Sequence, residues 1–249
     1  MRFLITRPEP DATALRAHLM AQGHEALIEP LMRIKFDDLD PIELDNVQAL
    51  IATSRNGLRA LAASPDFEHA RSLPLFAVGR GTASAARALG LETVLKGPGT
   101  GRQLVDVISE YVDVNNGSLL HLAGDVLAFD FAKELTRLGY HILSPVVYVA
   151  EAVQRLSGST VARLGNGHIE GVLLLSPRTA EIYANLIVQH DLADAVQDIR
   201  HYCISDATAD RLAELGIRRM EIAREPNLKE VLALTAHAAS ELPKITDRK

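Results

Sequence analysis

Short apolar runs alternate with segments of helical periodicity along almost the whole chain. The run at residues 171–175 is apolar on both faces, which is typical of a central strand in a parallel sheet. Large apolar side chains recur at helical spacing over residues 127–138, and Gly139 follows as the expected helix end. Strands that alternate with helices form βαβ units, so the pattern predicts an α/β protein with parallel sheets.

Polar residues beside these stretches indicate where helices begin. Asp11 is expected to cap a helix that stops at Gly23, and Thr82 and Thr208 are each expected to open a shorter helix.

The same succession of elements occurs twice. Self-similarity of this kind decides the architecture, and two copies are too few for a solenoid. The repeat therefore predicts two similar α/β domains that face one cleft. The matching segments are 3–8 with 119–124, 49–56 with 172–178, and 76–83 with 202–209.

Two extended segments interrupt this pattern at equivalent places in the repeat, residues 31–36 and 145–150. They are either ordinary edge strands or crossovers between domains. If they are crossovers, residues of about 35–150 form one domain and the two chain ends form the other. Periodicity leaves both possibilities open.

Composition is that of an ordinary globular protein. The 249 residues exceed the usual size of one domain, with 47% hydrophobic and 23% charged residues. No apolar run reaches the ~20 residues that span a bilayer, and the first residues lack the pattern of a signal peptide. A single cysteine, Cys203, rules out a disulfide framework and a cysteine-based metal site. We therefore expect a cytoplasmic protein with no membrane partner.

Charge and aromatic content argue against a nucleic-acid partner. The net charge is -6, whereas a surface that binds nucleic acid is basic. Tryptophan is absent and aromatic residues make up 4% of the chain, so base-stacking platforms are not expected. Local arginines and backbone amides can nevertheless bind a small anion despite the overall sign.

Candidate ligand contacts lie in the turns that follow strands, because doubly wound sheets bind ligands outside the carboxyl ends of their strands. Serine and threonine there can cap helices and leave the first helical N–H groups open to an anion. Each of these side chains also has a plainer interpretation, as a simple helix cap or a solvated charge. The candidates are Thr6, Arg7, Ser54, Arg55, Asn56, Gly79, Thr82, Ser176, Pro177, Arg178 and Thr208.

Known cofactor and metal motifs are missing from the sequence. Gly79 and Gly81 are followed by Ser84 where a dinucleotide fingerprint requires glycine or alanine. Residues 97–101 lack the lysine of a phosphate loop, so they are expected to be a plain connection. The histidines do not have the spacing of zinc ligands. We expect neither a metal nor an organic cofactor.

Tyr148 is the ionisable residue of most interest, because it lies in one of the two extended segments. In an ordinary strand its ring would serve packing. If the segment crosses between domains, the phenol faces the cleft and can donate a proton. A phenol is a weak acid, suited to assisting a leaving hydroxide.

Taken together, these residues resemble the uroporphyrinogen-III synthase family, over essentially the whole chain. The resemblance implies two flavodoxin-like domains, interleaved and joined by a two-stranded linker. One domain would comprise residues 1–34 and 151–249 and the other 35–150, with linkers near 31–37 and 146–152. It rests on residues 6–8, 53–54, 78–79, 82–83, 147–148, 176–177, 208–209 and 215–216.

The resemblance also implies a reaction. The family cyclises the linear tetrapyrrole hydroxymethylbilane to uroporphyrinogen III, with loss of water, inversion of the last ring and no cofactor. Tyr148 would then assist departure of the terminal hydroxyl, and the candidate turns would bind the substrate carboxylates. A monomer is expected. The alternative is a non-enzymatic two-domain cytoplasmic protein that binds or senses an anionic metabolite.

Two turns depart from the family pattern. Asp206 would repel a carboxylate, and the turn at Gly124 and Asp125 lacks an arginine found in many relatives. Substrate contact is therefore not expected at either turn.

Overall fold

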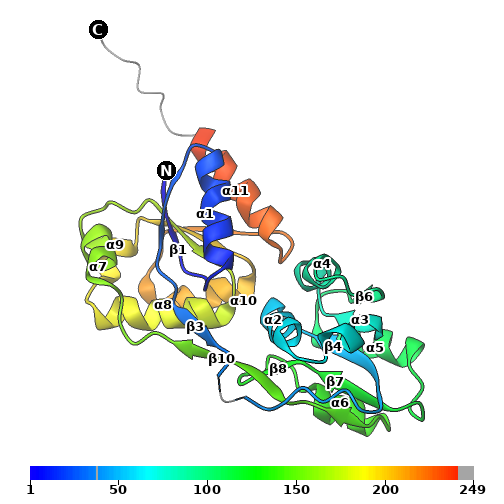
Figure 1. Cartoon of the computed structure of the whole chain (residues 1–249). Helices are drawn as coiled ribbons and strands as arrows, with labels where there is room; N and C mark the ends of the chain where they lie inside the picture. The colour runs from blue at the N-terminus through cyan, green and yellow to red at the C-terminus, as the bar shows by residue number, and fades with distance from the viewer. Residues whose placement is uncertain (38, 241–249) are drawn as a thin grey trace. The chain divides into compact units, whose positions relative to one another are not determined.

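The chain divides into two compact units (Figure 1). The computed structural model describes residues 1–37 and 39–240. Unit 1 comprises Met1–Arg33 and Glu151–Lys249, and unit 2 comprises Ile34–Ala150. The chain therefore passes between the units twice.

Both crossings occur within strands. The first lies in β3 (Met32–Lys35) and the second in β10 (Val146–Ala152), and these strands are neighbours in a three-stranded sheet (Figure 1). The third strand is β8 (Ala123–Gly124), which runs parallel to β10. The two extended segments of the sequence are therefore crossovers, and they also pair with each other.

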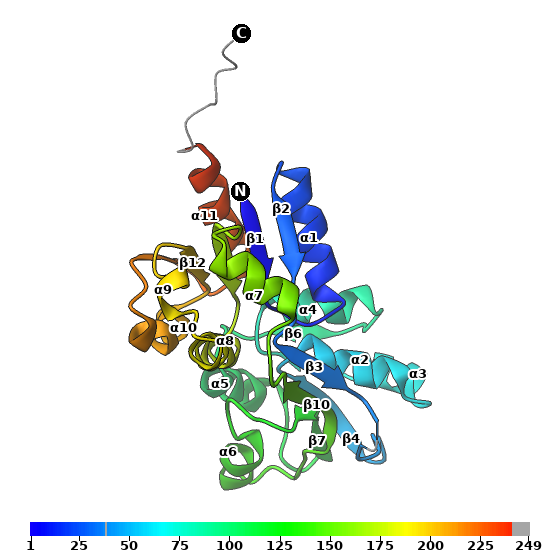
Figure 2. The same cartoon turned by 90° about the vertical axis from the view of Figure 1, so that its left-hand side faces the viewer.

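Unit 1 contains a five-stranded sheet in the order β13-β12-β11-β1-β2, and all of its neighbours run parallel. Counted along the chain this order is 2-1-3-4-5, as in flavodoxin. Figure 2 shows β1 and β2 side by side. The strands are β1 (Arg2–Ile5), β2 (Glu25–Ile28), β11 (Gly171–Leu174), β12 (Arg200–Cys203) and β13 (Arg219–Ile222).

Helices cover both faces of this sheet. Alternate residues of a strand point to opposite faces, so Phe3 and Leu173 pack in one core and Leu4 and Val172 in another. The first core includes residues of α1 and α11, and the second includes residues of α7 and α8 (Figure 1). The helices are α1 (Asp11–Ala21), α7 (Gly158–Gly165), α8 (Pro177–Gln189), α9 (Ala193–Val196), α10 (Asp206–Ala209), the 3-10 helix η1 (Asp210–Leu215) and α11 (Leu228–Ser240).

Unit 2 has a second parallel five-stranded sheet, in the order β6-β5-β4-β7-β9. The sequence repeat matches β7 with β1 and β4 with β11. If β6, β5, β4, β7 and β9 are matched with β13, β12, β11, β1 and β2, the two sheets have the same strand order. Along the chain, however, the sheet of unit 2 begins at a different strand. Unit 2 is thus a circular permutation of unit 1. Its strands are β4 (Val47–Ala52), β5 (Leu75–Ala77), β6 (Val94–Lys96), β7 (Ser118–His121) and β9 (Ile142–Leu143).

The core of unit 2 is built in the same way. Ile51 and Phe76 from the sheet pack with Leu104 of α5 and Leu135 of α6. The helices are α2 (Arg55–Ala63), α3 (Phe67–Ser72), α4 (Arg80–Ala88), α5 (Gly101–Tyr111) and α6 (Phe131–Arg137). The prediction of an α/β protein with two parallel sheets is therefore confirmed.

Several predicted helix starts were wrong. Asp11 is the first residue of α1 rather than its cap, and its carboxylate accepts a hydrogen bond from Arg7. Helices α4 and α10 begin before Thr82 and Thr208, which are buried within them. Asp130 caps α6, so the expected helix over 127–138 is shorter at its start than the pattern predicts.

Candidate functional site

A pocket of about 550 Å³ lies at the carboxyl ends of the strands of unit 2. Thr53 and Ser54 follow β4, Val78 follows β5, and His121 is the last residue of β7; all four line the pocket. Ligands of doubly wound proteins bind at this edge of the sheet. The pocket therefore lies beside strand-end turns of the kind that the sequence analysis took as candidates.

Ser54 connects this pocket to the start of α2. Its backbone is extended, and its Oγ accepts a hydrogen bond from the Asn56 backbone N–H at 3.1 Å. The sequence predicts this cap, and the structure confirms it. The first turn of α2 thus begins at the pocket wall.

Tyr148 lines the same pocket from β10 and is 9% exposed. It pairs with Gly124 of β8, and a Cβ added to Gly124 would lie 2.6 Å from Cζ of the Tyr148 ring. Only a glycine lets the ring lie this close to the neighbouring strand. The ring of Tyr148 is therefore held at the pocket by the backbone of β8.

Asp125 has a structural role next to Tyr148. Its backbone N–H donates to the Tyr148 carbonyl at 3.2 Å, and its carboxylate accepts from the Ala150 N–H at 2.9 Å. These bonds bind β10 on both sides of Val149. The Asp125 carboxylate is thus engaged by the backbone of β10, whereas Gly124 in the same turn lines the pocket.

The start of α5 forms another wall that the sequence analysis missed. Gly99, Thr100, Gly101 and Arg102 line the pocket, although this segment was expected to be a plain connection. Thr100 caps α5 by accepting from the Gln103 N–H at 3.3 Å, and its hydroxyl donates to the Gln103 side chain at 2.8 Å. Threonine followed three residues later by glutamine is a capping-box pattern, so the signal was present in the sequence.

Arg102 is the cation of this pocket. Within the part of the chain that the structure describes, its side chain makes no hydrogen bond or ion pair. A helix start together with an unpaired guanidinium favours a negatively charged group.

The remaining wall is apolar. It comprises Val78 and a segment that leads into α6, with Leu127, Phe129 and Phe131. The Phe129 and Phe131 rings pack edge to face, with centroids 4.9 Å apart. The pocket thus joins an aromatic wall to polar helix starts.

His121 is the buried polar group of the pocket. Its side chain is fully buried, and burial lowers its pKa to about 4, although the charge of Asp130 acts in the opposite direction. The imidazole is therefore neutral at physiological pH. His121 was not among the candidates from the sequence, where the histidines were noted only for lacking the spacing of zinc ligands.

The other predicted residues of unit 2 do not line this pocket. The side-chain oxygen of Asn56 accepts from Arg59 at 2.6 Å, and Arg55 follows directly after Ser54. Gly79 precedes α4 with an extended backbone, and an added Cβ would meet nothing within 4 Å. Thr82 is 8% exposed.

Unit 1 places three predicted residues together at the start of α8. Ser176 caps the helix by accepting from the Thr179 N–H at 3.1 Å, Pro177 is the first helical residue, and Arg178 follows it. Proline suits this position because its missing N–H would have had no helical partner. The predicted Ser176 cap is thus confirmed.

Three further predicted residues of unit 1 have internal partners. The hydroxyl of Thr6 is fully buried and donates to the Leu173 carbonyl at 2.7 Å. Thr208 is fully buried, with its hydroxyl 3.0 Å from that of Ser205. Arg7 lies 2.7 Å from the Asp11 carboxylate. The hydroxyls of Thr6 and Thr208 are thus buried and hydrogen-bonded within unit 1.

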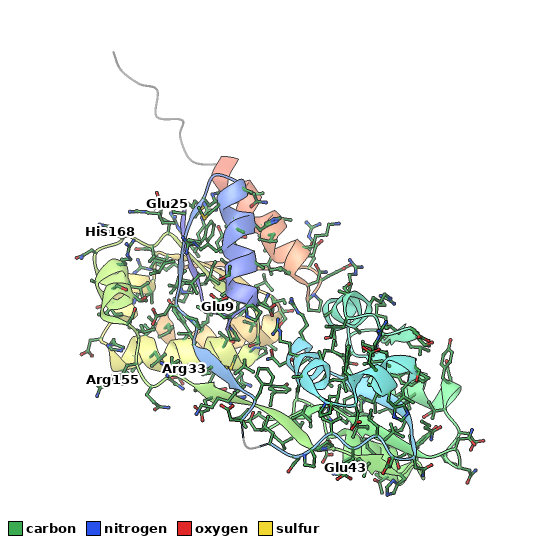
Figure 3. The ribbon with its side chains drawn as sticks, in the orientation of Figure 1. Glu9, Glu25, Arg33, Glu43, Arg155 and His168 are labelled. Carbon is green, nitrogen blue, oxygen red and sulfur yellow. The ribbon has the colours of Figure 1, made fainter. Side chains whose placement is uncertain are left out.

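A wider hollow of about 930 Å³ lies in unit 1 beside the ends of β3 and β10. Arg33 and Arg155, which Figure 3 labels, line it together with Glu29 and Glu151. The Glu29 carboxylate already accepts from the hydroxyl of Ser157 at 2.6 Å. None of the predicted site residues lies here, so the pocket of unit 2 is the better candidate.

Two features of the described residues concern metal ions and membranes. Histidine, cysteine and carboxylate side chains form no group of three that could hold a metal ion. Within residues 1–37 and 39–240, no helix is both long and apolar enough to cross a membrane.

Comparison with known proteins shows to which family the chain is related. The family model described as uroporphyrinogen-III synthase HemD matches residues 13–233. No curated protein shows a significant match.

Solved structures share the fold. Uroporphyrinogen-III synthetase from Helicobacter pylori is 18% identical, with a TM-score of 0.62 over 96% of this chain and 100% of that one. A mutant uroporphyrinogen III synthase from the extremely thermophilic bacterium Thermus thermophilus is 17% identical, with a TM-score of 0.58 over 97% and 100%. At this identity the likeness concerns the fold alone. Because the family model covers most of its length, the chain belongs to the uroporphyrinogen-III synthase HemD family, whose members are hydro-lyases.

Proposed function

We propose that this protein converts hydroxymethylbilane to uroporphyrinogen III, with loss of water and inversion of the last pyrrole ring. One observation beyond family membership supports this most strongly. The pocket of unit 2 combines Tyr148, two helix starts, Arg102 and an aromatic wall. The bilane is a chain of flat pyrrole rings that carry carboxylates, so it needs all of these features.

The polar side of the pocket would bind carboxylates. Ser54 and Thr100 stand at the starts of α2 and α5, where helical N–H groups and the helix dipole favour an anion. The guanidinium of Arg102 can add a charge-assisted hydrogen bond. Arg55 and Asn56 begin α2, Gly79 and Thr82 lie at the start of α4, and all four remain proposed contacts.

The turns of unit 1 would supply further carboxylate contacts. Ser176, Pro177 and Arg178 begin α8, a helix of 13 residues. Arg7 follows β1, and its neighbour Thr6 could contribute only its backbone, as could Thr208. We propose that the two units correspond to the two domains of the family.

The chemistry would begin at the terminal hydroxymethyl group. Tyr148 donates a hydrogen bond and then a proton to the departing hydroxide, which leaves as water with the electrons of the C–O bond. The pyrrole nitrogen supplies electron density and becomes part of an azafulvene cation. The substituted carbon of the last ring attacks this cation, and the resulting spiro intermediate fragments and recloses at the free carbon of that ring. The proton that this carbon loses returns to the Tyr148 phenolate.

Orientation is the main task of such an enzyme. Hydroxymethylbilane closes readily by itself without inverting the last ring. The protein must therefore fix the geometry of a flexible substrate more than it must accelerate a slow step. Holding reacting atoms in place can contribute several kcal/mol, up to roughly 7–11.

The test is to supply hydroxymethylbilane and measure the isomers of uroporphyrinogen by chromatography. The proposal predicts type III product, formed faster than the spontaneous type I. Type I alone at the spontaneous rate would show that the protein is not this enzyme. Tight binding of the bilane without turnover would instead support the alternative, a non-enzymatic binding protein.

We also propose that the protein acts as a cytoplasmic monomer. The single cysteine, Cys203, is buried and free, which suits a reducing compartment. Light scattering should give a mass near the 27.1 kDa of one chain. A mass of twice this value would exclude the monomer.

A further inference from the structure

His121 lines the pocket of unit 2 and carries an unused hydrogen-bonding atom. The residue is fully buried, and its Nδ1 lies 3.0 Å from the Ser144 hydroxyl. Its Nε2 is buried and has no hydrogen-bond partner among the described residues. Buried polar atoms are nearly always paired, so an unpaired one calls for an explanation, such as a bound ligand.

Another buried histidine of this protein shows the ordinary situation. His201 lies in the core of unit 1, with Nδ1 2.9 Å from the Ile199 carbonyl and Nε2 3.0 Å from the Tyr183 hydroxyl. Both ring nitrogens are therefore satisfied. His24 also has an unpaired Nε2, but it lies away from the pocket of unit 2. Among the described histidines, only His121 combines an unpaired buried nitrogen with a place in the candidate active site.

The surroundings of His121 limit what can bind its Nε2. The imidazole packs against the Phe131 ring with centroids 5.0 Å apart, and Phe129 packs against Phe131. A carboxylate placed against these rings would lose its hydration, and the neutral imidazole of His121 offers it no charge. A pyrrole ring is flat and apolar, and it carries one N–H donor. It thus matches the aromatic wall and one hydrogen-bond acceptor.

We propose that Nε2 of His121 accepts a hydrogen bond from the pyrrole N–H of the substrate ring that bears the hydroxymethyl group. In this arrangement Nδ1–H donates to Ser144, which leaves the lone pair of Nε2 for the substrate. The inference rests on the proposed function, because it takes the bilane as the ligand. It adds a substrate-binding residue that recognises the ring rather than its carboxylates.

The same contact would favour the first chemical step. When the C–O bond breaks, its electron pair leaves with the oxygen, and the ring nitrogen takes up positive charge while it keeps its proton. The N–H then becomes a stronger donor, so its hydrogen bond to a neutral imidazole strengthens as the charge develops. A histidinium would repel this charge, and burial keeps His121 neutral. The contact is therefore expected to affect kcat more than KM.

Three substitutions of His121 distinguish a role in substrate binding from a purely structural role. His121→Gln can place an amide oxygen near the position of Nε2, whereas His121→Asn can replace only Nδ1 and its bond to Ser144. His121→Phe keeps a ring but has neither nitrogen. We expect the Phe and Asn variants to lose roughly ten- to a hundredfold in kcat, and the Gln variant to retain most of it. Circular dichroism and the thermal midpoint establish that each variant is folded.

The reverse order would overturn the inference. If Asn restores activity and Gln does not, His121 acts only through Ser144 as part of the scaffold. If the Phe variant has unchanged kcat, Nε2 has no role in the reaction. These outcomes require an active wild-type protein, whereas a failure of the proposed function would appear as an inactive wild type.

Ser144 provides a second test if the variants of His121 do not fold. Ser144→Ala removes the partner that holds the proton on Nδ1. The imidazole can then adopt either tautomer, so kcat should fall several-fold with little change in KM. An unchanged kcat in this variant would contradict the inference.

Discussion

At the scale of single residues, the candidate chemistry depends on the hydroxyl group of Tyr148. Tyr148→Phe keeps the ring against Gly124 and removes only the proton donor. We expect turnover to slow by roughly ten- to a hundredfold without stopping, because orientation of the substrate remains. Steady-state kinetics with hydroxymethylbilane would measure this. Tyr111→Phe is the matched control, since Tyr111 is 68% exposed and outside the pocket; equal rates for both variants would remove the role of Tyr148.

Gly124 offers a separate test of the same feature. In Gly124→Ala the new methyl group would lie 2.6 Å from Cζ of Tyr148, so the ring or the strand must move. We expect a loss of about 1–3 kcal/mol in stability from overpacking, together with reduced kcat. Gly158→Ala is the control, because a Cβ there meets nothing within 4 Å. Thermal unfolding and turnover would be compared; a fully active, stable Gly124→Ala protein would show that the close packing is unimportant.

At the scale of elements, Ser54 has two functions that can be separated. Its hydroxyl caps α2 and also lines the pocket. Replacing a serine cap with alanine costs about 1 kcal/mol, whereas glycine costs only a few tenths. Ser54→Ala should therefore unfold at lower denaturant than Ser54→Gly. If the hydroxyl also binds substrate, both variants should show the same increase in KM. If KM rises more in the less stable variant, Ser54 acts only as a helix cap.

The elements that the sequence predicted well are those whose apolar pattern has one interpretation. Residues 171–174 form a strand buried on both faces, and the two extended segments are strands. Helix starts were less certain, because a threonine before an apolar stretch can cap a helix or lie inside it. Thr82 and Thr208 lie inside, since Gly79 and Ser205 hold the cap positions.

The candidate site was predictable only in part, for a physical reason. Ser54 was found because a helix cap after a strand has a sequence signature, and Tyr148 because it lies in one of the two extended segments. His121 and Arg102 were missed, since their place in the pocket depends on contacts between distant segments. The sequence of β7 cannot show that one nitrogen of His121 lacks a partner, because Ser144 and Phe131 come from other elements.

At the scale of the whole molecule, the two sheets are built from the same repeat, but the chain begins each sheet at a different strand of that repeat. Along the chain, the five-stranded sheet of unit 1 begins with β1 and β2 and is completed by β11, β12 and β13, whereas that of unit 2 begins with β4 and ends with β9. Equivalent strands therefore hold equivalent places in both sheets. This explains why the helix-capping serines Ser54 and Ser176, after β4 and β11, recur at matching positions of the repeat.

Each unit also contains a deeply buried histidine, and this makes stability depend on pH. Burial lowers the pKa of His201 in unit 1 and of His121 in unit 2 to about 4, below the ordinary value of 6.5. Below pH 6.5 the unfolded chain therefore binds protons that the folded chain does not. The free energy of unfolding should therefore be highest above pH 6.5. Below that pH, each of the two histidines should lower it by about 1.4 kcal/mol for every pH unit, until the pH approaches 4.

His201→Gln tests this linkage directly. The variant should be less stable than the wild type at pH 7, because it alters the contacts to Tyr183 and Ile199. Glutamine cannot take up the proton, so acid destabilises only the wild type at this position. The difference in free energy of unfolding between wild type and variant should therefore narrow by about 2 kcal/mol from pH 7 to pH 5. Urea denaturation at both pH values would measure this, with His168→Gln as the control, since His168 is exposed on the same unit (Figure 3). A difference that stays constant with pH would mean that His201 binds its proton equally well in the folded and unfolded chains, and that the acid sensitivity of unit 1 has another source.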